Sequence, residues 1–343
     1  MTNSDNCHAA SPSRRRFLQQ AGATGLAGMT APLLARPTMD AVTSSLRPPA
    51  RQAAVDTHCG ATVVAGHSKP QLTALQAWGN LVYPIGVVKC FFGDQHYPTA
   101  PDPTVSAAIK LGAEVILCYR PTFSGTSGPG GNKPSKQQLN HDQADMVSSI
   151  EALQNAGAKV TAVTMYSEPT GTAGLSADQY NYLYKWNYSA LRKLARVGCC
   201  QSGGAADQIA NYFPGPTTAH PSATLYTDGL AVDYYGGNYL SGNKPLSLWT
   251  SVADYARVAF GIWESGDSAT GGPPLKKAEA KAYITSAGDP VNSMQAVLDN
   301  RKANGLPNMH YLWFQNNGGS GPNRILKSGD FRIDFLRTLQ QSL

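Results

Sequence analysis

Eight short apolar runs, separated by amphipathic or polar stretches, constrain the fold of this chain more than any other feature. Each run is rich in Val, Ile and aromatic residues and is apolar almost throughout rather than at every second position. This pattern is typical of a strand that is buried on both faces, as in a parallel sheet. The runs lie at 61–65, 86–92, 114–119, 159–166, 197–201, 230–235, 257–263 and 310–314.

Several of the stretches between these runs have the periodicity of an amphipathic helix. In one of them, Met146, Ile150 and Leu153 recur at steps of three and four and share one face. We expect helices at 68–78, 137–155, 176–196, 246–256, 290–302 and 331–339.

Residues typical of helix ends accompany these segments. Ser176 is expected to be an N-cap, and Asp289 with Pro290 favours a helix start at 290. A glycine is common just after the last turn of a helix. We therefore expect helix-terminating roles for Gly112, Gly157, Gly198 and Gly305.

Eight buried strands that alternate with helices predict an α/β fold, namely the (β/α)8 TIM barrel. An open, doubly wound parallel sheet is the alternative. That fold favours a Gly-rich phosphate-binding turn directly after a strand, and the Gly-rich stretch at 125–131 neither follows a strand directly nor opens a helix. We expect this stretch to be a loop after the third strand.

The first residues of the chain have the composition of an export signal. Arg14, Arg15 and Arg16 precede an apolar run of small residues at 21–35. The pattern S-R-R-x-F-L resembles the bacterial twin-arginine signal. We therefore expect a signal peptide at 1–35, a Pro- and Ser-rich linker at 36–54 and the barrel at 55–343. The resemblance implies the twin-arginine export machinery as a partner, a secreted or periplasmic protein and no stable membrane anchor.

Charge and cysteine content exclude several classes of function. The net charge is +6, of which residues 1–35 supply +2, and the basic residues are not clustered as nucleic-acid binding requires. Five cysteines follow Cys7, an odd number that permits at most two disulfides. Four of them lie inside apolar runs, where a small buried side chain is the commoner reading: Cys90, Cys118, Cys199 and Cys200. The sequence has no H-x-H, H-E-x-x-H, C-x-x-C or G-x-S-x-G motif. We therefore expect no metal site, no cofactor and no serine-hydrolase site.

Two glutamates follow apolar runs that end in an aromatic residue. Glu168 comes two residues after Tyr166, and Glu264 comes directly after Trp263. In a (β/α)8 barrel, the groups that catalyse the reaction lie at the carboxyl ends of the strands. A pair of carboxyl groups suits the cleavage of a glycosidic bond, in which one acid protonates the leaving oxygen and one carboxylate attacks the sugar.

Other residues at the same strand ends are candidates for binding a sugar. Aromatic rings would exclude water and stack on a pyranose, and polar or basic side chains would bind its hydroxyl groups. The aromatic candidates are Tyr166, Tyr234, Tyr235, Trp263 and Trp313. The polar candidates are Ser167, Lys89 and Arg120, with Asp94, Asp228 and Asp233 as further hydrogen-bonding groups or as turn and cap residues.

This arrangement resembles the clan-A glycoside hydrolases, which are retaining enzymes on a (β/α)8 barrel. Ser167-Glu168-Pro169 looks like their Asn-Glu-Pro, residues 262–266 look like their nucleophile strand, and Trp313 looks like their strand-eight tryptophan. The resemblance implies that Glu168 is the acid/base, that Glu264 is the nucleophile and that the substrate is a β-linked oligo- or polysaccharide. It also implies that Tyr234 or Tyr235 hydrogen-bonds the nucleophile.

The sequence departs from that family at Ser167, where the family has an Asn that contacts the sugar 2-hydroxyl. A shorter side chain makes a non-catalytic carbohydrate-binding barrel the alternative function. The sugar, its linkage and endo or exo action stay open at this point.

Overall fold

A computed structural model describes most of the chain beyond residue 57. The described residues are 58–64, 85–121, 134–167, 169, 175–202, 208–242, 245–267, 274–314 and 329–342. The expected signal peptide and linker, the helix at 68–78 and the Gly-rich loop at 125–131 lie outside the described residues.

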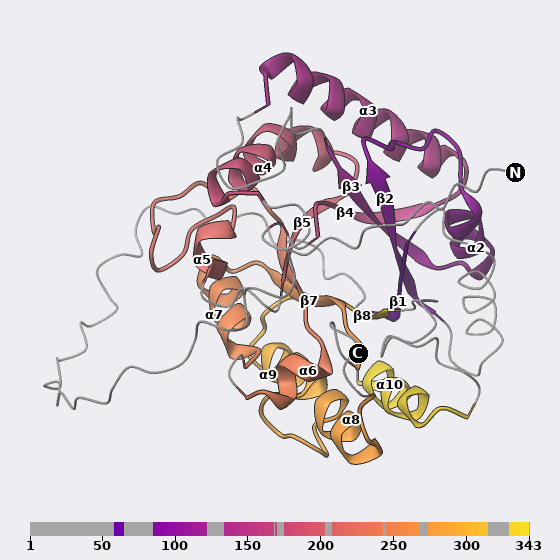
Figure 1. Cartoon of the computed structure of the whole chain (residues 1–343), viewed down its shortest axis with the longest axis vertical. Coiled ribbons are helices and arrows are strands. Elements are labelled where there is room, and N and C mark those ends of the chain that lie inside the picture. Colours follow the sequence, from indigo (N-terminus) through magenta and orange to yellow (C-terminus); the bar gives the residue numbers. More distant parts are fainter. Residues whose placement is uncertain are drawn as a thin grey trace, which may run out of the picture. The chain divides into compact units, whose positions relative to one another are not determined.

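Eight parallel strands form a closed barrel in the order of the sequence (Figure 1). The strands are β1 (Cys59–Val64), β2 (Val87–Asp94), β3 (Glu114–Arg120), β4 (Lys159–Met165), β5 (Arg196–Ser202), β6 (Gly229–Asp233), β7 (Ala259–Glu264) and β8 (Asn308–Phe314). Ala61 pairs with Val88 of β2 on one side and with Trp313 of β8 on the other, so β1 has no free edge. The expected (β/α)8 barrel is confirmed, and an open sheet is excluded.

The strands are buried on both faces, as their continuous apolar character predicts. Their outward side chains join the helices in one large core, and their inward side chains form a second core that holds strand residues alone. The inner core consists of Val87, Ile116, Ala162, Cys200, Ala231, Ala259, Trp263, Met309 and Leu312. The barrel interior is therefore packed with side chains rather than open.

Helices surround the strands in Figure 1. They are α2 (Pro103–Leu111), α3 (Lys136–Asn155), α4 (Ala177–Leu191), α5 (Ile209–Tyr212), α6 (Gly236–Leu240), α7 (Ser247–Ala256), α8 (Lys277–Ile284), α9 (Met294–Ala303) and α10 (Phe331–Gln341). Ser176 is the N-cap of α4, where its hydroxyl accepts the amide N–H of Gln179, as expected. Gly112 follows α2 with a φ of 68°, a left-handed conformation that favours glycine.

Three expectations about helix ends are wrong. Helix α4 ends at Leu191 instead of 196, because a turn at 192–194 leads into β5. Helix α9 begins at Met294 instead of 290, because Asp289 accepts the N–H groups of Val291 and Asn292 and so closes a turn before the helix.

The third correction concerns Gly198, which lies inside β5 rather than after a helix. A Cβ at this position would lie 2.3 Å from Cη2 of Trp263. The glycine therefore provides space for the indole that fills the barrel interior.

A tyrosine of α4 joins β4 and β5, which share a short backbone ladder. The β4–β5 pairing consists of Ala162 with Arg196 and Val163 with Val197. Beyond these pairs, the Tyr184 hydroxyl donates to the Gly198 carbonyl at 2.9 Å and accepts the Met165 N–H at 3.3 Å. A side chain thus joins the two strands where the backbone ladder stops, just below the strand ends that carry the candidate site.

The cysteines after Cys7 are all buried, and none forms a disulfide within the described part of the chain. Cys199 belongs to the outer core and Cys200 to the inner core, as expected for neighbours in a strand. The reading of these residues as small buried thiols is confirmed.

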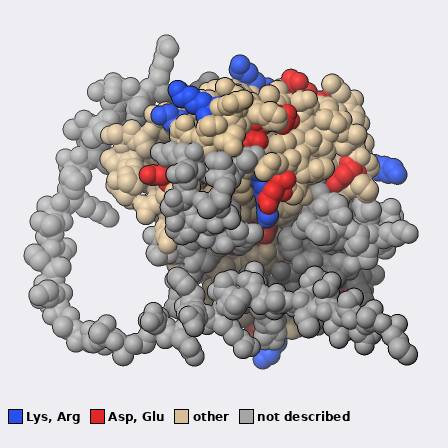
Figure 2. All heavy atoms as spheres, turned by 45° about the horizontal axis from the view of Figure 1, so that its top comes forward, with Lys and Arg blue, Asp and Glu red and all other residues tan. Residues whose placement is uncertain are grey.

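The face in Figure 2 carries scattered basic and acidic side chains that are separated by other residues. Within the described ranges, no helix is both long enough and apolar enough to cross a membrane.

Candidate active site

Five polar side chains meet at the carboxyl ends of the strands. Four come from four different strands, and the fifth comes from the second residue beyond another strand. We call them the mouth cluster: Lys89 from β2, Ser167 after β4, Cys200 from β5, Asp233 from β6 and Glu264 from β7. All five are buried. In a (β/α)8 barrel this end is where active sites lie.

Lys89 is the cation of the mouth cluster and is fully buried. Its ammonium lies 3.0 Å from Oε1 of Glu264, 3.8 Å from Oδ1 of Asp233 and 2.9 Å from Oγ of Ser167. Burial by itself lowers the pKa of Lys89, but the negative charges of Glu264 and Asp233 beside it raise that pKa well above its ordinary value. Lys89 is therefore charged at neutral pH and acts as the counter-ion of the two carboxyl groups.

Ser167 lies between the two acids. Its Oγ is 2.9 Å from Oε1 of Glu264 and 3.0 Å from Oδ2 of Asp233. A hydroxyl group has one proton to donate, so Ser167 donates a hydrogen bond to one carboxyl group at a time while its oxygen accepts a hydrogen bond from Lys89. This short side chain connects the ends of β4, β6 and β7.

Both oxygens of Glu264 have partners in the described structure. Oε1 accepts hydrogen bonds from Lys89 and Ser167, and Oε2 accepts one from the Tyr235 hydroxyl at 3.1 Å. Tyr235, the N-cap residue of α6, thus makes the contact for which Tyr234 was an equal candidate. The carboxyl group of Glu264 is fixed in orientation.

Sequence reasoning missed Cys200 as part of the site and treated Asp233 only as one of several hydrogen-bonding acids. The Cys200 thiol lies 2.9 Å from Oδ1 of Asp233. Burial of the thiol, together with the negative charge of Asp233, raises the pKa of Cys200 well above its ordinary value. The thiol is therefore a protonated donor to Asp233. The available signal was the alternation in β5, which places one member of the Cys199-Cys200 pair inside the barrel.

Three of the aromatic candidates lie away from the mouth cluster or below it. Trp263 is fully buried in the inner core, with its ring centroid 5.9 Å from Nζ of Lys89, so it supports the cluster from within the barrel. Tyr234 and Trp313 belong to the outer core, where both pack against Tyr283 of α8 with ring centroids 6.1 and 6.5 Å away.

The remaining candidates lie near the ends of β3 and β4. The Tyr166 hydroxyl donates to the Pro121 carbonyl, and Tyr166 has a left-handed φ of 56°. Arg120 is partly exposed, with Nη1 3.6 Å from Oδ1 of Asp94. Glu168 lies outside the described residues. The structure thus brings together Lys89, Ser167, Tyr235 and Glu264 from the set expected from the sequence.

Among the described residues, no group of three or more His, Cys, Asp or Glu side chains is arranged to hold a metal ion. The mouth cluster instead combines an ammonium group, a hydroxyl, a thiol and two carboxyl groups, with the phenol of Tyr235 beside them, and these groups suit proton transfer and nucleophilic attack.

Comparison with known proteins finds similarity in structure alone. No family model matches the sequence, and no curated protein matches it. A GH30 endoxylanase from Clostridium papyrosolvens C71 superposes with a TM-score of 0.54 at 12% identity, covering 84% of this chain and 72% of that one. A modular endo-β-1,4-mannanase of glycoside hydrolase family 26 from Cellulomonas fimi gives 0.51 at 14% identity, with coverages of 83% and 70%.

An exo-β-1,4-mannosidase from an Opitutaceae bacterium also gives a TM-score of 0.51, at 13% identity, and the match covers 84% of this chain and 60% of that one. The superpositions show that the chain shares the (β/α)8 barrel of these glycoside hydrolases. At identities this low the likeness extends to the fold alone, because one fold carries many functions.

Proposed function

We propose that this protein is a retaining glycoside hydrolase that cleaves a β-linked oligo- or polysaccharide, with Glu264 as its nucleophile. The observation that carries the proposal is the environment of Glu264. Its carboxyl group lies at the carboxyl end of β7, with Lys89 and Ser167 on one oxygen and Tyr235 on the other. A carboxylate that must attack a sugar needs this fixed orientation and a nearby counter-ion.

The reaction that we propose has two steps. In the first, Glu168 donates its proton to the glycosidic oxygen, the bond from that oxygen to the anomeric carbon breaks, and a Glu264 oxygen bonds to the carbon. In the second, Glu168 takes a proton from water, the water oxygen bonds to the anomeric carbon, and the Glu264 ester bond breaks. Lys89 and Tyr235 hold Glu264 in both steps.

A non-catalytic carbohydrate-binding barrel is the second candidate, and Ser167 favours it. Its hydroxyl already lies within 3.0 Å of oxygens of Glu264 and Asp233. A group engaged in this way has little capacity left for a sugar 2-hydroxyl, so the contact that the family makes through Asn would be weaker or would pass through water.

The decisive experiment is hydrolysis of xylan, β-mannan and β-1,3-glucan by the wild-type protein and by Glu264→Gln. Glutamine keeps the size of the side chain but cannot form the ester. We expect Glu264→Gln to lose hydrolysis and to keep sugar binding, and Glu168→Gln to lose about 10²–10⁴-fold in rate. Glu151→Gln, on the exposed face of α3, is the matched control.

Each alternative outcome has a defined meaning. Hydrolysis that survives in Glu264→Gln would refute Glu264 as the nucleophile. A product that first appears as the opposite anomer in an NMR time course would refute retention. A wild-type protein that binds these sugars and hydrolyses none of them would establish the non-catalytic alternative.

We also propose that residues 1–35 direct export through the twin-arginine machinery and that the enzyme acts in the periplasm or outside the cell. The support is the S-R-R-x-F-L pattern and the apolar run that follows it. Replacing both Arg14 and Arg15 by Lys should leave the protein in the cytoplasm. Unchanged export of that variant would refute the proposal.

A further inference from the structure

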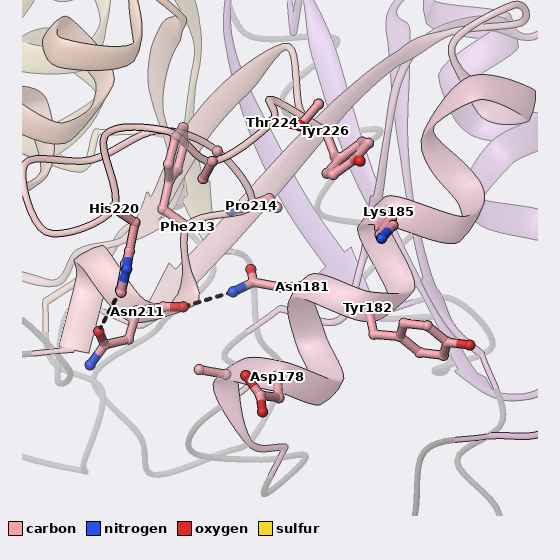
Figure 3. Close-up of a pocket in the computed structure, with 13 residues that line it drawn as sticks. Asp178, Asn181, Tyr182, Lys185, Asn211, Phe213, Pro214, His220, Thr224 and Tyr226 are labelled. Atoms are coloured by element: carbon pink, nitrogen blue, oxygen red, sulfur yellow. Dashed lines mark hydrogen bonds between the residues drawn. The ribbon is translucent and has the colours of Figure 1, made fainter.

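A groove of about 690 Å³ lies between α4 and the segment 211–226 (Figure 3). It exists because α5 is a single turn, Ile209–Tyr212, and an irregular segment continues from it toward β6. The lining residues include Asn181, Tyr182 and Lys185 from α4 and Phe213, His220 and Tyr226 from the segment. Its volume falls within the range of about 300–1,000 Å³ that is typical of small-molecule sites.

The groove is separate from the mouth cluster, with which it shares no residue. Helix α4 lies between them. Tyr180 and Tyr184 are fully buried, and their hydroxyls donate to the backbone carbonyls of Cys200 and Gly198 in β5. Asn181, Tyr182 and Lys185 are less buried and line the groove instead.

The chemistry of the lining suits an uncharged, hydroxyl-rich ligand. Aromatic rings, primary amides and an imidazole predominate, and the two charged groups, Asp178 and Lys185, are of opposite sign. The C–H faces of a pyranose pack on aromatic rings, while amides bind hydroxyl groups as both donors and acceptors. An anionic or cationic ligand would lack a matching excess of charge here.

An unsatisfied acceptor supports the same reading. Nδ2 of Asn181 donates to the Asn211 carbonyl at 2.8 Å, whereas Oδ1 of Asn181 is buried and has no hydrogen-bond partner among the described residues. Figure 3 shows the Asn181 side chain reaching from α4 toward Asn211, with its oxygen directed away from that contact. Buried acceptors without a donor are rare in proteins, and a rotation of the Asn181 side chain toward the groove would let a ligand hydroxyl supply one.

The wall opposite α4 is already formed. The Tyr226 N–H donates to the Pro214 carbonyl at 2.8 Å, so a hydrogen bond closes the segment 211–226 near its two ends. Gly215 is tightly packed, because a Cβ there would lie 2.5 Å from Leu225 Cδ1 and 2.7 Å from Phe213 Cε1. A preformed wall reduces the conformational entropy that the protein loses when a ligand binds.

We propose that this groove is a second carbohydrate-binding site, which binds a neutral stretch of the polysaccharide chain outside the active site. The choice of a β-linked chain rests on the proposed function, whereas the preference for a neutral sugar rests on the groove itself. A site of this kind raises the local concentration of polymer at the barrel mouth, so its effect falls on polymeric substrates and not on short ones.

The first test is calorimetric titration of the Glu264→Gln protein with xylohexaose, mannohexaose and laminarihexaose, which are not turned over in this background. Tyr182→Ala should weaken groove binding of the hexasaccharide by about tenfold, the size of one lost ring contact. Tyr255→Ala removes an exposed tyrosine from α7, outside the groove, and should leave the affinity for the hexasaccharides unchanged.

A second pair of variants leaves all existing contacts in place. Thr224→Trp adds bulk at an exposed lining position, and Ser222→Trp adds the same bulk at an exposed neighbour that does not line the groove. We expect Thr224→Trp to abolish groove binding and Ser222→Trp to keep it. With Glu264 intact, Thr224→Trp should slow the hydrolysis of polysaccharide while its rate on a short aryl glycoside equals that of Ser222→Trp.

Failure of this inference is distinguishable from failure of the proposed function. Hexasaccharide binding that depends on Tyr182 and Thr224 in a protein without hydrolytic activity would support the groove and refute the glycosidase. Hydrolysis by the wild-type protein, together with hexasaccharide affinities of both groove variants equal to those of their controls, would refute the groove and leave the glycosidase in place.

Discussion

Replacing Lys89 by Met tests how the mouth cluster is held together. Methionine has nearly the same length but no charge, so the change leaves Glu264 and Asp233 buried without the ammonium that now lies 3.0 and 3.8 Å from them. The methionine also retains apolar contact with Phe91, whose ring centroid lies 4.5 Å from Nζ of Lys89. The free energy of unfolding that the variant loses is therefore mainly electrostatic.

The magnitude follows from the burial of the pair. Lys89 is fully buried and the Glu264 side chain is 8% exposed, so solvent screens their interaction weakly. Removing one member of a buried pair costs about 3–5 kcal/mol in the free energy of unfolding. Because the pKa of Lys89 is raised in the folded protein, this contribution is complete below its ordinary pKa of about 10.4 and is lost only as the pH rises through the folded value.

Urea unfolding at pH 7, followed by tryptophan fluorescence, measures the loss. Lys110→Met on the exposed surface of α2 is the matched control and should change the free energy of unfolding by no more than about 0.5 kcal/mol. The double variant Lys89→Met/Glu264→Gln should lose less than the sum of the single variants, with a coupling of about 0.5–3 kcal/mol. A Lys89→Met protein as stable as its control, or strictly additive losses, would refute the reasoning.

Two further predictions concern the barrel interior and its amino-terminal end. Gly198→Ala should cost about 1–3 kcal/mol in urea unfolding, because its Cβ would overlap the buried Trp263 ring; an unchanged midpoint would mean that the ring moves freely. At the amino-terminal end, Nε2 of His310 lies 3.1 Å from Oε2 of Glu114. Burial lowers the pKa of His310. Burial alone would raise the pKa of Glu114, but the contact with His310 outweighs it and lowers that pKa. Both groups bind protons more readily when unfolded, so the melting temperature should fall as the pH drops from about 6.5 through about 4.3, and a constant value over that range would contradict this account.

The architecture was predictable because the signal for it is local and repeated. A strand that is buried on both faces must be apolar at nearly every position, so its sequence differs from that of an amphipathic helix without knowledge of its neighbours. Glu264 was predictable for a related reason. A carboxylate directly after such a run lies at the carboxyl end of a strand, and in a barrel all of those ends lie on one side.

The helix ends were less predictable because competing hydrogen bonds decide them. Asp289 and Pro290 form a plausible helix start by sequence, but the Asp289 side chain accepts two backbone N–H groups in a turn and Ser293 becomes the N-cap of α9. Gly198 suits a helix end by composition. Its actual position follows from the space that Trp263 requires, a residue 65 positions later in the chain.

The sequence by itself determined that the strands are buried on both faces, that they alternate with helices, and that Glu264 ends the seventh of them. Only the tertiary structure decided which of two neighbouring side chains enters the site. Alternation along a strand places Cys199 and Cys200 on opposite faces, but it does not say which face is the interior. Tyr234 and Tyr235 lie just beyond the end of β6, where the path of the chain into α6 decides which of them reaches Glu264.

That choice depends on register, which the strands set together. At the β6–β7 pair the register shifts between Val232 and Asp233, so that Asp233 lies opposite Glu264. An irregularity of this kind changes which side chains point inward, and it is defined only when the two strands are paired. The chemical groups of the site could therefore be identified from the sequence, whereas their assembly around Lys89 depends on the closure of the barrel.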